Sequence, residues 1–192
     1  MACTACSEAK AKQKSVPKKS KHKEATTPNG RIYLDISTIK KPKHMKQVKH
    51  VYQPHWGILM DETTQLKFTE FFDTKSGMVE PTCELFQLWK QNGKEVKVVR
   101  CDNAGENLKL DNRLKSADWK LNVKFEYTAR NTPQQNSLAE KAFDTLYSRG
   151  RAMMNAANIP KILRYSLFRE AFKTATFLDG LTMIELNGIT KT

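Results

Sequence analysis

The sequence predicts an α/β domain with a mixed five-stranded sheet flanked by helices, its elements following in the order βββαβαβα. Three β-prone runs, residues 32–36, 56–60 and 66–72, follow one another with no helical pattern between them, which is typical of an antiparallel meander. A helical pattern over 78–91 then leads into another strand. Because a strand–helix–strand unit crosses over to a parallel neighbour, the sheet is expected to be mixed.

The first strand carries an acid where a strand rarely has one. Asp35 stands between apolar neighbours in the run 32–36, and such a residue in a buried strand needs a partner or a function. The run 56–60 is apolar throughout, residues 61–65 form a turn, and the run 66–72 alternates in part.

The first predicted helix is amphipathic and has recognisable ends. Pro81 suits a first turn and Asn92-Gly93 a stop, so the helix is placed at 78–91. Its apolar stripe recurs at helical spacing: Met78, Thr82, Leu85, Phe86 and Trp89.

The fourth strand ends on a second acid. Val96, Val98 and Val99 are β-branched and predict a buried strand that closes at Asp102. A turn-type cluster follows at 103–105, so the Asp102 carboxylate is placed at the carboxyl end of a core strand, where open α/β sheets hold their sites. The alternative is that Asp102 only starts a turn or caps the next helix.

The remaining elements are a short helix near 106–118, a fifth strand at 123–127 and two long helices. Thr132-Pro133 predicts a capped start for the first long helix, which runs from Gln134 to about Asn155. The second follows Pro160 and is expected to stop at Asp179-Gly180. Its predicted core stripe is Leu163, Leu167, Phe168, Ala171, Phe172, Ala175 and Leu178.

Positive charge is concentrated at the start of the chain. The net charge is +13, and residues 1–50 hold 13 Lys or Arg against 3 acids, a net charge of +10. Such a block attracts polyanions, nucleic acid above all, although a solvated leader without a specific partner is the alternative. No run reaches the length of a membrane span and the start lacks a signal-peptide pattern, so no membrane is expected, and the protein is placed in the cytosol or nucleus. The run 17–23 fits a nuclear-import signal.

The four cysteines divide into two kinds. Cys3 and Cys6 form a C-x-x-C pair, which is half of a zinc site, and no second pair lies at conventional spacing. Cys83 and Cys101 fall inside apolar patterns and are interpreted as reduced core residues.

Three acids and two motifs carry a resemblance. Asp35, Asp102 and Glu140 are separated by 66 and 37 residues. Residues 101–107, C-D-N-A-G-E-N, resemble the pattern S-D-N-G-x-E-F, and residues 132–141, T-P-Q-Q-N-S-L-A-E-K, are similar to T-P-Q-Q-N-G-V-A-E-R. Both patterns are typical of the integrase catalytic core of copia-type retrotransposons, which shares its RNase H-like fold with retroviral integrases. The resemblance covers about residues 30 to 180.

The resemblance implies a domain plan. Residues 1–29 would be a basic leader, disordered and left from a zinc-binding segment before the core, with only Cys3 and Cys6 of the zinc ligands and hence an incomplete zinc site. Residues 30–181 would be the catalytic core and 182–192 a truncated C-terminal extension. The function implied is that of the integrase domain of a Pol polyprotein in the nucleus, a homo-oligomer when intact that acts on element ends and target DNA.

The resemblance also implies the chemistry. Asp35, Asp102 and Glu140 would hold two Mg²⁺ or Mn²⁺ ions, since hard cations prefer carboxylate oxygens and paired ions stabilise phosphoryl transfer. The reactions expected are 3′-end processing and then strand transfer. DNA phosphates would be held by Gln135, Asn136, Lys141, Lys40, Lys41 and Lys43. Two alternatives stay open: an RNase H-like nuclease that cuts without joining, and an inactive nucleic-acid-binding remnant of a degenerate element.

Overall fold

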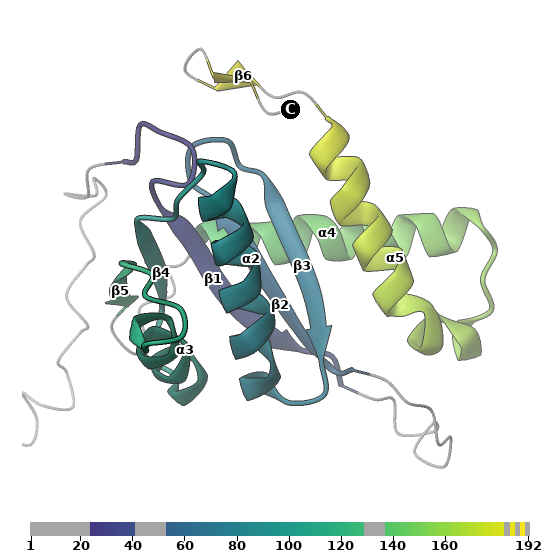
Figure 1. Ribbon diagram of the computed structural model, residues 1–192. Coiled ribbons are helices and arrows are strands. Elements are labelled where there is room, and N and C mark those ends of the chain that lie inside the picture. The colour runs from purple at the N-terminus through teal and green to yellow at the C-terminus, as the bar shows by residue number, and fades with distance from the viewer. Residues whose placement is uncertain (1–23, 41–52, 129–136, 183–184, 187–188, 191–192) are drawn as a thin grey trace, which may run out of the picture.

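The structure is a computed structural model that describes residues 24–40, 53–128, 137–182, 185–186 and 189–190. Five strands form one mixed sheet in the order β3-β2-β1-β4-β5 (Figure 1). They are β1 (Ile32–Thr38), β2 (His55–Asp61), β3 (Lys67–Phe72), β4 (Val98–Asp102) and β5 (Lys124–Thr128). The predicted fold class and the predicted order of elements are therefore confirmed.

The strand directions follow the prediction. β1, β2 and β3 pair antiparallel as a meander, with Asp35 opposite Ile58 in the first pair. β4 pairs parallel with both β1 and β5. The crossovers contain α2 (Val79–Gln91) and α3 (Gly105–Lys115), which lie on the near face of the sheet in Figure 1. A parallel pair needs such a connection, because a tight turn can only join antiparallel strands.

Alternating side chains give the sheet two apolar faces. Ile32, Leu34, Val99 and Cys101 belong to the cluster that α2 and α3 cover. Tyr33, Trp56, Ile58 and Phe71 belong to a second cluster with α4 (Ser137–Ala156) and α5 (Lys161–Leu181). In Figure 1, α4 crosses behind the strands. Asp35 has the same alternation as Tyr33, so it belongs to the face on which α4 packs.

A one-turn 3₁₀-helix, η2 (Lys75–Met78), precedes α2. The Thr74 hydroxyl accepts a hydrogen bond from the Gly77 N–H at its start. At the other end of α2, Gly93 has φ of 71°, a left-handed conformation that glycine adopts without strain. The predicted helix at 78–91 is thus confirmed as α2, and the 3₁₀ turn that precedes it ends at Met78.

The last long helix differs from its prediction in two ways. Leu163, Leu167 and Leu178 were expected in the core but are exposed, while Phe168, Phe172 and Ala175 are buried as expected. The helix also continues to Leu181, one residue beyond the predicted stop at Asp179-Gly180. Asp179 is only 3% exposed, and it pairs with Lys67 at 2.8 Å and with Arg149. A paired acid does not end a helix, so the turn-forming tendency of Asp-Gly loses to tertiary contacts.

The crossing of α4 and α5 depends on a glycine. A Cβ added at Gly150 would lie 2.3 Å from the ring of Phe172, so only glycine lets the helices approach this closely. The predicted cap at Thr132-Pro133 lies outside the described residues. Two short strands, β6 (Glu185–Leu186) and β7 (Ile189–Thr190), pair with each other after α5. In the described part of the chain, no helix is both long and apolar enough to cross a bilayer.

Candidate active site

The structure places the three predicted acids on three elements. Asp35 lies within β1, Asp102 is the last residue of β4, and Glu140 is in the first turn of α4. In the parallel pair of β1 and β4, Tyr33 is opposite Arg100. Continuing this register by two residues sets Asp35 beside Asp102 on the same face of the sheet. The paired ladder itself ends at Tyr33 and Arg100, although both strands continue.

The electrostatics of Asp35 show that the acids influence one another. Burial raises the pKa of Asp35 to about 6. The Ile36 N–H donates to its Oδ1 at 2.8 Å and lowers the pKa, whereas the charges of Asp102 and Glu140 raise it. The negative charges of Asp102 and Glu140 favour the protonated, neutral form of Asp35. A bound cation would have the opposite effect and favour the carboxylate.

Asp102 is held in place by its own loop. Its Oδ1 accepts hydrogen bonds from Nδ2 of Asn107 at 2.7 Å and from the Ala104 N–H at 3.3 Å. The Asp102 side chain is exposed, so its carboxylate stays open to solvent. The turn-initiating interpretation of Asp102 is therefore correct as local structure, and it leaves the other carboxylate oxygen available.

The trio does not form a closed metal cage. Among the described residues, no three His, Cys, Asp or Glu side chains stand close enough together to hold a metal ion. Glu140 is exposed on α4, four positions after the undescribed residues 129–136. The charges of Asp102 and Glu140 therefore act on Asp35, but the three side chains do not surround a single point.

A basic residue that the sequence did not single out lies at this site. The charge of Lys75, in η2, lowers the pKa of Asp35. Its Nζ also lies 3.5 Å from Oε1 of Glu106 in the first turn of α3. No sequence pattern pointed to Lys75, because only the packing of η2 against α3 brings it near Asp35. Asn107 was missed as well, because no sequence pattern shows that the first turn of α3 faces the end of β4.

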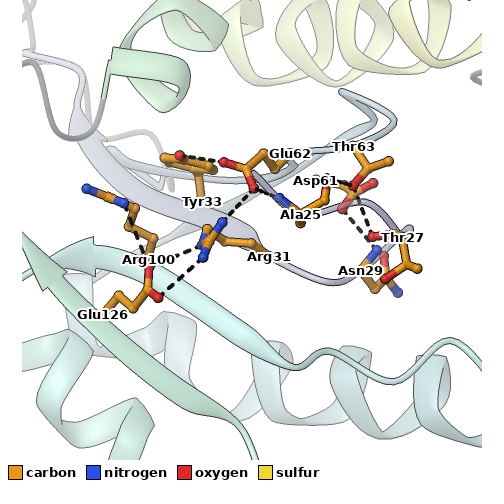
Figure 2. Close-up of polar contacts among 10 residues, drawn as sticks. All are labelled: Ala25, Thr27, Asn29, Arg31, Tyr33, Asp61, Glu62, Thr63, Arg100 and Glu126. Atoms are coloured by element: carbon orange, nitrogen blue, oxygen red, sulfur yellow. Dashed lines mark hydrogen bonds and ion pairs between the residues drawn. The ribbon is translucent and has the colours of Figure 1, made fainter. Parts of the chain in front are cut away.

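A polar network begins two residues before Asp35 and Asp102 on their strands, at Tyr33 and Arg100 (Figure 2). Tyr33, Arg100 and Glu126 stand side by side on β1, β4 and β5. The Arg100 guanidinium is 5.9 Å from the centre of the Tyr33 ring and 3.7 Å from Oε2 of Glu126. Arg31 bridges two acids: its Nε lies 3.1 Å from Oε2 of Glu126, and its Nη1 lies 2.7 Å from Oε2 of Glu62. This network ties four strands together beneath the acids.

The same network attaches the residues before β1 to the turn between β2 and β3. The Ala25 N–H donates to Oε2 of Glu62 at 2.7 Å, and the Asn29 N–H donates to Oδ1 of Asp61 at 3.0 Å (Figure 2). The Thr63 hydroxyl donates to the carbonyl of Thr27. Residues from Ala25 onward therefore pack against the sheet, a few positions before the predicted domain start at residue 30.

The other predicted site residues are only partly described. Lys141 is exposed directly after Glu140, and Lys40 is exposed at the end of a described range. The remaining predicted residues lie outside the described ranges: Gln135, Asn136, Lys41, Lys43, Cys3 and Cys6. The predicted reduced cysteines are confirmed, since Cys83 and Cys101 are free and buried, and burial raises the pKa of each thiol to about 12.

An apolar groove lies away from the acids. A cavity of about 590 Å³ is bounded by β3, α2 and α5, and its walls include Phe68, Leu85 and Phe177. Asp35, Asp102 and Glu140 do not line it. The groove has the apolar lining of a packing or docking surface and contains none of the three acids, so the acids remain the candidate active site.

The pKa of Asp35 gives a testable pH dependence. An acid whose pKa is higher in the folded than in the unfolded state loses stabilisation as pH rises, here between about pH 4 and pH 6. In chelator, urea unfolding should therefore show the parent protein less stable at pH 8 than at pH 5. Asp35→Asn should remove most of this difference, and Asp73→Asn, an exposed acid after β3, should leave it intact. Equal pH dependence in the parent and Asp35→Asn would contradict the assignment.

Comparison with known proteins is consistent with this geometry. No protein-family model matches the chain. An 89-residue stretch, 46% of this chain, is 30% identical to the retrovirus-related Pol polyprotein from transposon TNT 1-94 of Nicotiana tabacum. The stretch spans 6% of that polyprotein, so the chain corresponds to a small part of its relative.

Solved structures show the same fold. The HTLV-2 integrase catalytic core domain in complex with magnesium superposes with a TM-score of 0.56, at 15% identity, over 85% of this chain and 94% of that one. The catalytic core domain of BIV integrase gives 0.55 at 14% identity over 85% and 91%. A chain of the simian T-cell lymphotropic virus intasome with PP2A regulatory subunit B56 gamma gives 0.59 at 15% identity over 99% and 61%. The chain therefore has the RNase H-like fold of integrase catalytic cores.

Proposed function

We propose that this chain is the integrase catalytic core of a retrotransposon Pol polyprotein. The observation that carries the proposal is the placement of Asp35 and Asp102 on adjacent parallel strands, with the charge of Glu140 acting on Asp35. Support comes from the fold it shares with integrase cores and from the similarity to a retrotransposon polyprotein. The reaction proposed is transfer of DNA 3′ ends into a target strand.

The acids fit a divalent cation. Asp35 and Asp102 offer hard carboxylate oxygens on one face. Burial is the main cause of the raised pKa of Asp35, and the charges of Asp102 and Glu140 add to it, so a cation would neutralise that negative charge. Asp35 and Asp102 would hold Mg²⁺ or Mn²⁺ between them, and Glu140 would complete the set from α4. When bound, such ions stabilise charge on the attacking and leaving oxygens of phosphoryl transfer. The HTLV-2 core was solved with magnesium.

This chain's own residues have separate tasks in that reaction. Asp102 is oriented by its loop, while Asp35 is fixed by the strand and by the Ile36 N–H. Lys141 and Lys75 are exposed cations near the acids and would contact DNA phosphates, which position a duplex without reading its sequence. We also propose that the protein acts as a homo-oligomer in the nucleus, on element ends and target DNA.

An oligonucleotide assay tests the proposal. The full chain is incubated with Mg²⁺ or Mn²⁺, a labelled duplex that mimics an element end and a target plasmid. Products longer than the labelled strand support an integrase. Shortened products alone would instead indicate a nuclease that cuts without joining, and the absence of both, together with retained DNA binding, would indicate an inactive remnant.

The basic leader should dominate non-specific DNA affinity. Residues 1–23 hold seven lysines and one acid, and the described contacts to the sheet begin only after them. Deleting 1–23 should flatten the slope of log affinity against log salt, because each lost phosphate contact removes about 0.9 from that slope. Fluorescence anisotropy between 50 and 300 mM salt measures the slope. The control is a chain whose leader keeps its length but has its lysines replaced by serine. An unchanged slope would make the leader a bystander in DNA binding.

A further inference from the structure

Asn107 occupies an unusual position for an amide side chain. It is the third residue of α3, it is 3% exposed, and it points back to the end of β4. Its Nδ2 donates to the Asp102 carboxylate at 2.7 Å and to the Asp102 backbone carbonyl at 3.1 Å. Both hydrogens of one buried amide are therefore directed to a single residue.

The orientation of the amide is fixed by chemistry. If the Asn107 group were turned over, its carbonyl oxygen would face two Asp102 oxygens that can only accept hydrogen bonds. In the orientation present, Oδ1 of Asn107 is buried without a protein partner. Burying Oδ1 without a partner costs free energy. The two hydrogen bonds from Nδ2 to Asp102 offset that cost and keep the side chain in this orientation.

These contacts treat the two carboxylate oxygens of Asp102 differently. Oδ1 takes the bonds from Asn107 and from the Ala104 N–H, and no described residue donates to Oδ2. A carboxylate bound at one oxygen through a buried donor cannot rotate freely. Its second oxygen then keeps one direction relative to Asp35 and the face of the sheet on which α4 packs.

We infer that Asn107 is a positioning residue that fixes the Asp102 carboxylate for cation binding. This inference rests on the proposed function and adds a residue to it. Partners that orient a ligand from behind typically account for 10- to 100-fold in metal affinity or activity. The pattern that residues 101–107 resemble has Phe at the position of Asn107. A Phe side chain has no hydrogen-bond donor, so the contact to Asp102 is a feature of this chain's Asn107.

The variants separate orientation from packing. Asn107→Leu keeps the branched shape and the number of side-chain heavy atoms and removes the donor together with the unsatisfied Oδ1, so the fold should keep its melting temperature in chelator to within a few degrees. Asn107→Gln keeps an amide at the third helical position, where longer amides commonly reach back to the preceding turn. Leu110→Val, at a fully buried site one turn further along α3, is the control for loss of packing alone.

Two readouts are taken on the full chain. One is the Mn²⁺ or Mg²⁺ concentration that gives half of the metal-induced rise in melting temperature. The other is the concentration that half-activates strand transfer. We expect Asn107→Leu to raise both concentrations about 10-fold or more. Asn107→Gln should recover part of the loss, and Leu110→Val should lower the melting temperature without moving either concentration.

The outcomes distinguish this inference from the proposed function. If the parent performs strand transfer and Asn107→Leu has the parent's two half-saturating concentrations, the role of Asn107 is overturned while the function stands. If the parent shows a metal-induced rise in melting temperature that Asn107→Leu shifts, but no strand transfer, the function is overturned and the positioning role is supported. A parent with neither response overturns both. A shift in Leu110→Val equal to that in Asn107→Leu also overturns the role, since packing would explain it.

Discussion

Asp102→Asn should abolish metal-dependent strand transfer and cleavage while leaving the melting temperature in chelator equal or higher. A neutral amide is a poor ligand for a hard cation, so the chemistry is lost. The substitution also removes one of the charges that raise the pKa of Asp35, which should stabilise the apo protein by something on the order of 1 kcal/mol.

The loop should tolerate this change. The carbonyl oxygen of the new amide can still accept the hydrogen bonds that Asp102 receives from Asn107 and from the Ala104 N–H. The substitution therefore alters charge while the local contacts persist. Most of the Mg²⁺- or Mn²⁺-induced rise in melting temperature should disappear with the carboxylate.

Thermal unfolding with chelator and with metal, alongside the oligonucleotide assay, measures both effects. Asp144→Asn is the matched control, because Asp144 is an exposed acid one turn beyond Glu140 on α4 and loses the same charge. That control should keep activity and the metal response. A variant at Asp102 that stays active and melts lower in chelator would reduce this residue to a turn cap and end the two-metal interpretation.

Arg31→Met should have the largest effect on stability, a loss of about 3–5 kcal/mol. The Arg31 side chain is 10% exposed and joins Glu62, itself 7% exposed, to Glu126. Without the guanidinium, Glu62 is left as a buried carboxylate that has lost its cationic partner while it still accepts hydrogen bonds from Tyr33 and the Ala25 N–H. Breaking one side of a buried ion pair costs more than the pair contributes, because the remaining charge is uncompensated.

The pH dependence of this effect has a definite sign. Burial alone would raise the pKa of Glu62, but hydrogen bonds from the Ala25 N–H, Arg31 and Tyr33 hold it below its ordinary value. In the parent, this contribution to stability is present above the ordinary pKa of a glutamate and is lost as pH falls. The gap between the parent and Arg31→Met should therefore narrow in acid, as urea unfolding at pH 4 and pH 7 can measure.

Arg113→Met provides the comparison. Arg113 also binds two carboxylates, those of Glu80 and Asp118, but it does so on the surface, where water screens the charges. Its loss should leave the unfolding midpoint nearly unchanged. If the two arginine variants lose similar stability, burial is not what gives the Arg31 pairs their strength.

The sequence predicted most of the fold because local patterns carried it. The β-prone run around Asp35, the β-branched run before Asp102 and the stop at Asn92-Gly93 each specify an element within a few residues. The acids of the candidate site were found for the same reason, since each stands at a recognisable position in its element. Their motifs added a family resemblance that spacing alone does not supply.

What the sequence did not predict depends on contacts between distant segments. Arg31 and Glu126 are 95 positions apart, and Lys67 and Asp179 are 112 apart, so no local pattern pairs them. Asp179 was taken as part of a helix stop because its partners, Lys67 on β3 and Arg149 on α4, are supplied only by the packing of α5 on these elements. Asn107 was missed for a different reason: it is close to Asp102 in sequence, but its role comes from the direction in which the first turn of α3 faces the end of β4.

The early end of the β1–β4 ladder gives the site a mechanical character. Asp35 belongs to the meander on which α4 packs, whereas Asp102 ends β4, which pairs with β5, and the described pairing between β1 and β4 stops at Tyr33 and Arg100. Neighbouring strands twist by about 20° relative to each other, so a small change of twist at this seam is magnified at the unpaired ends beyond it. We therefore expect the separation of the two carboxylates to change with the twist of the sheet beyond the last pair of this ladder, Tyr33 and Arg100.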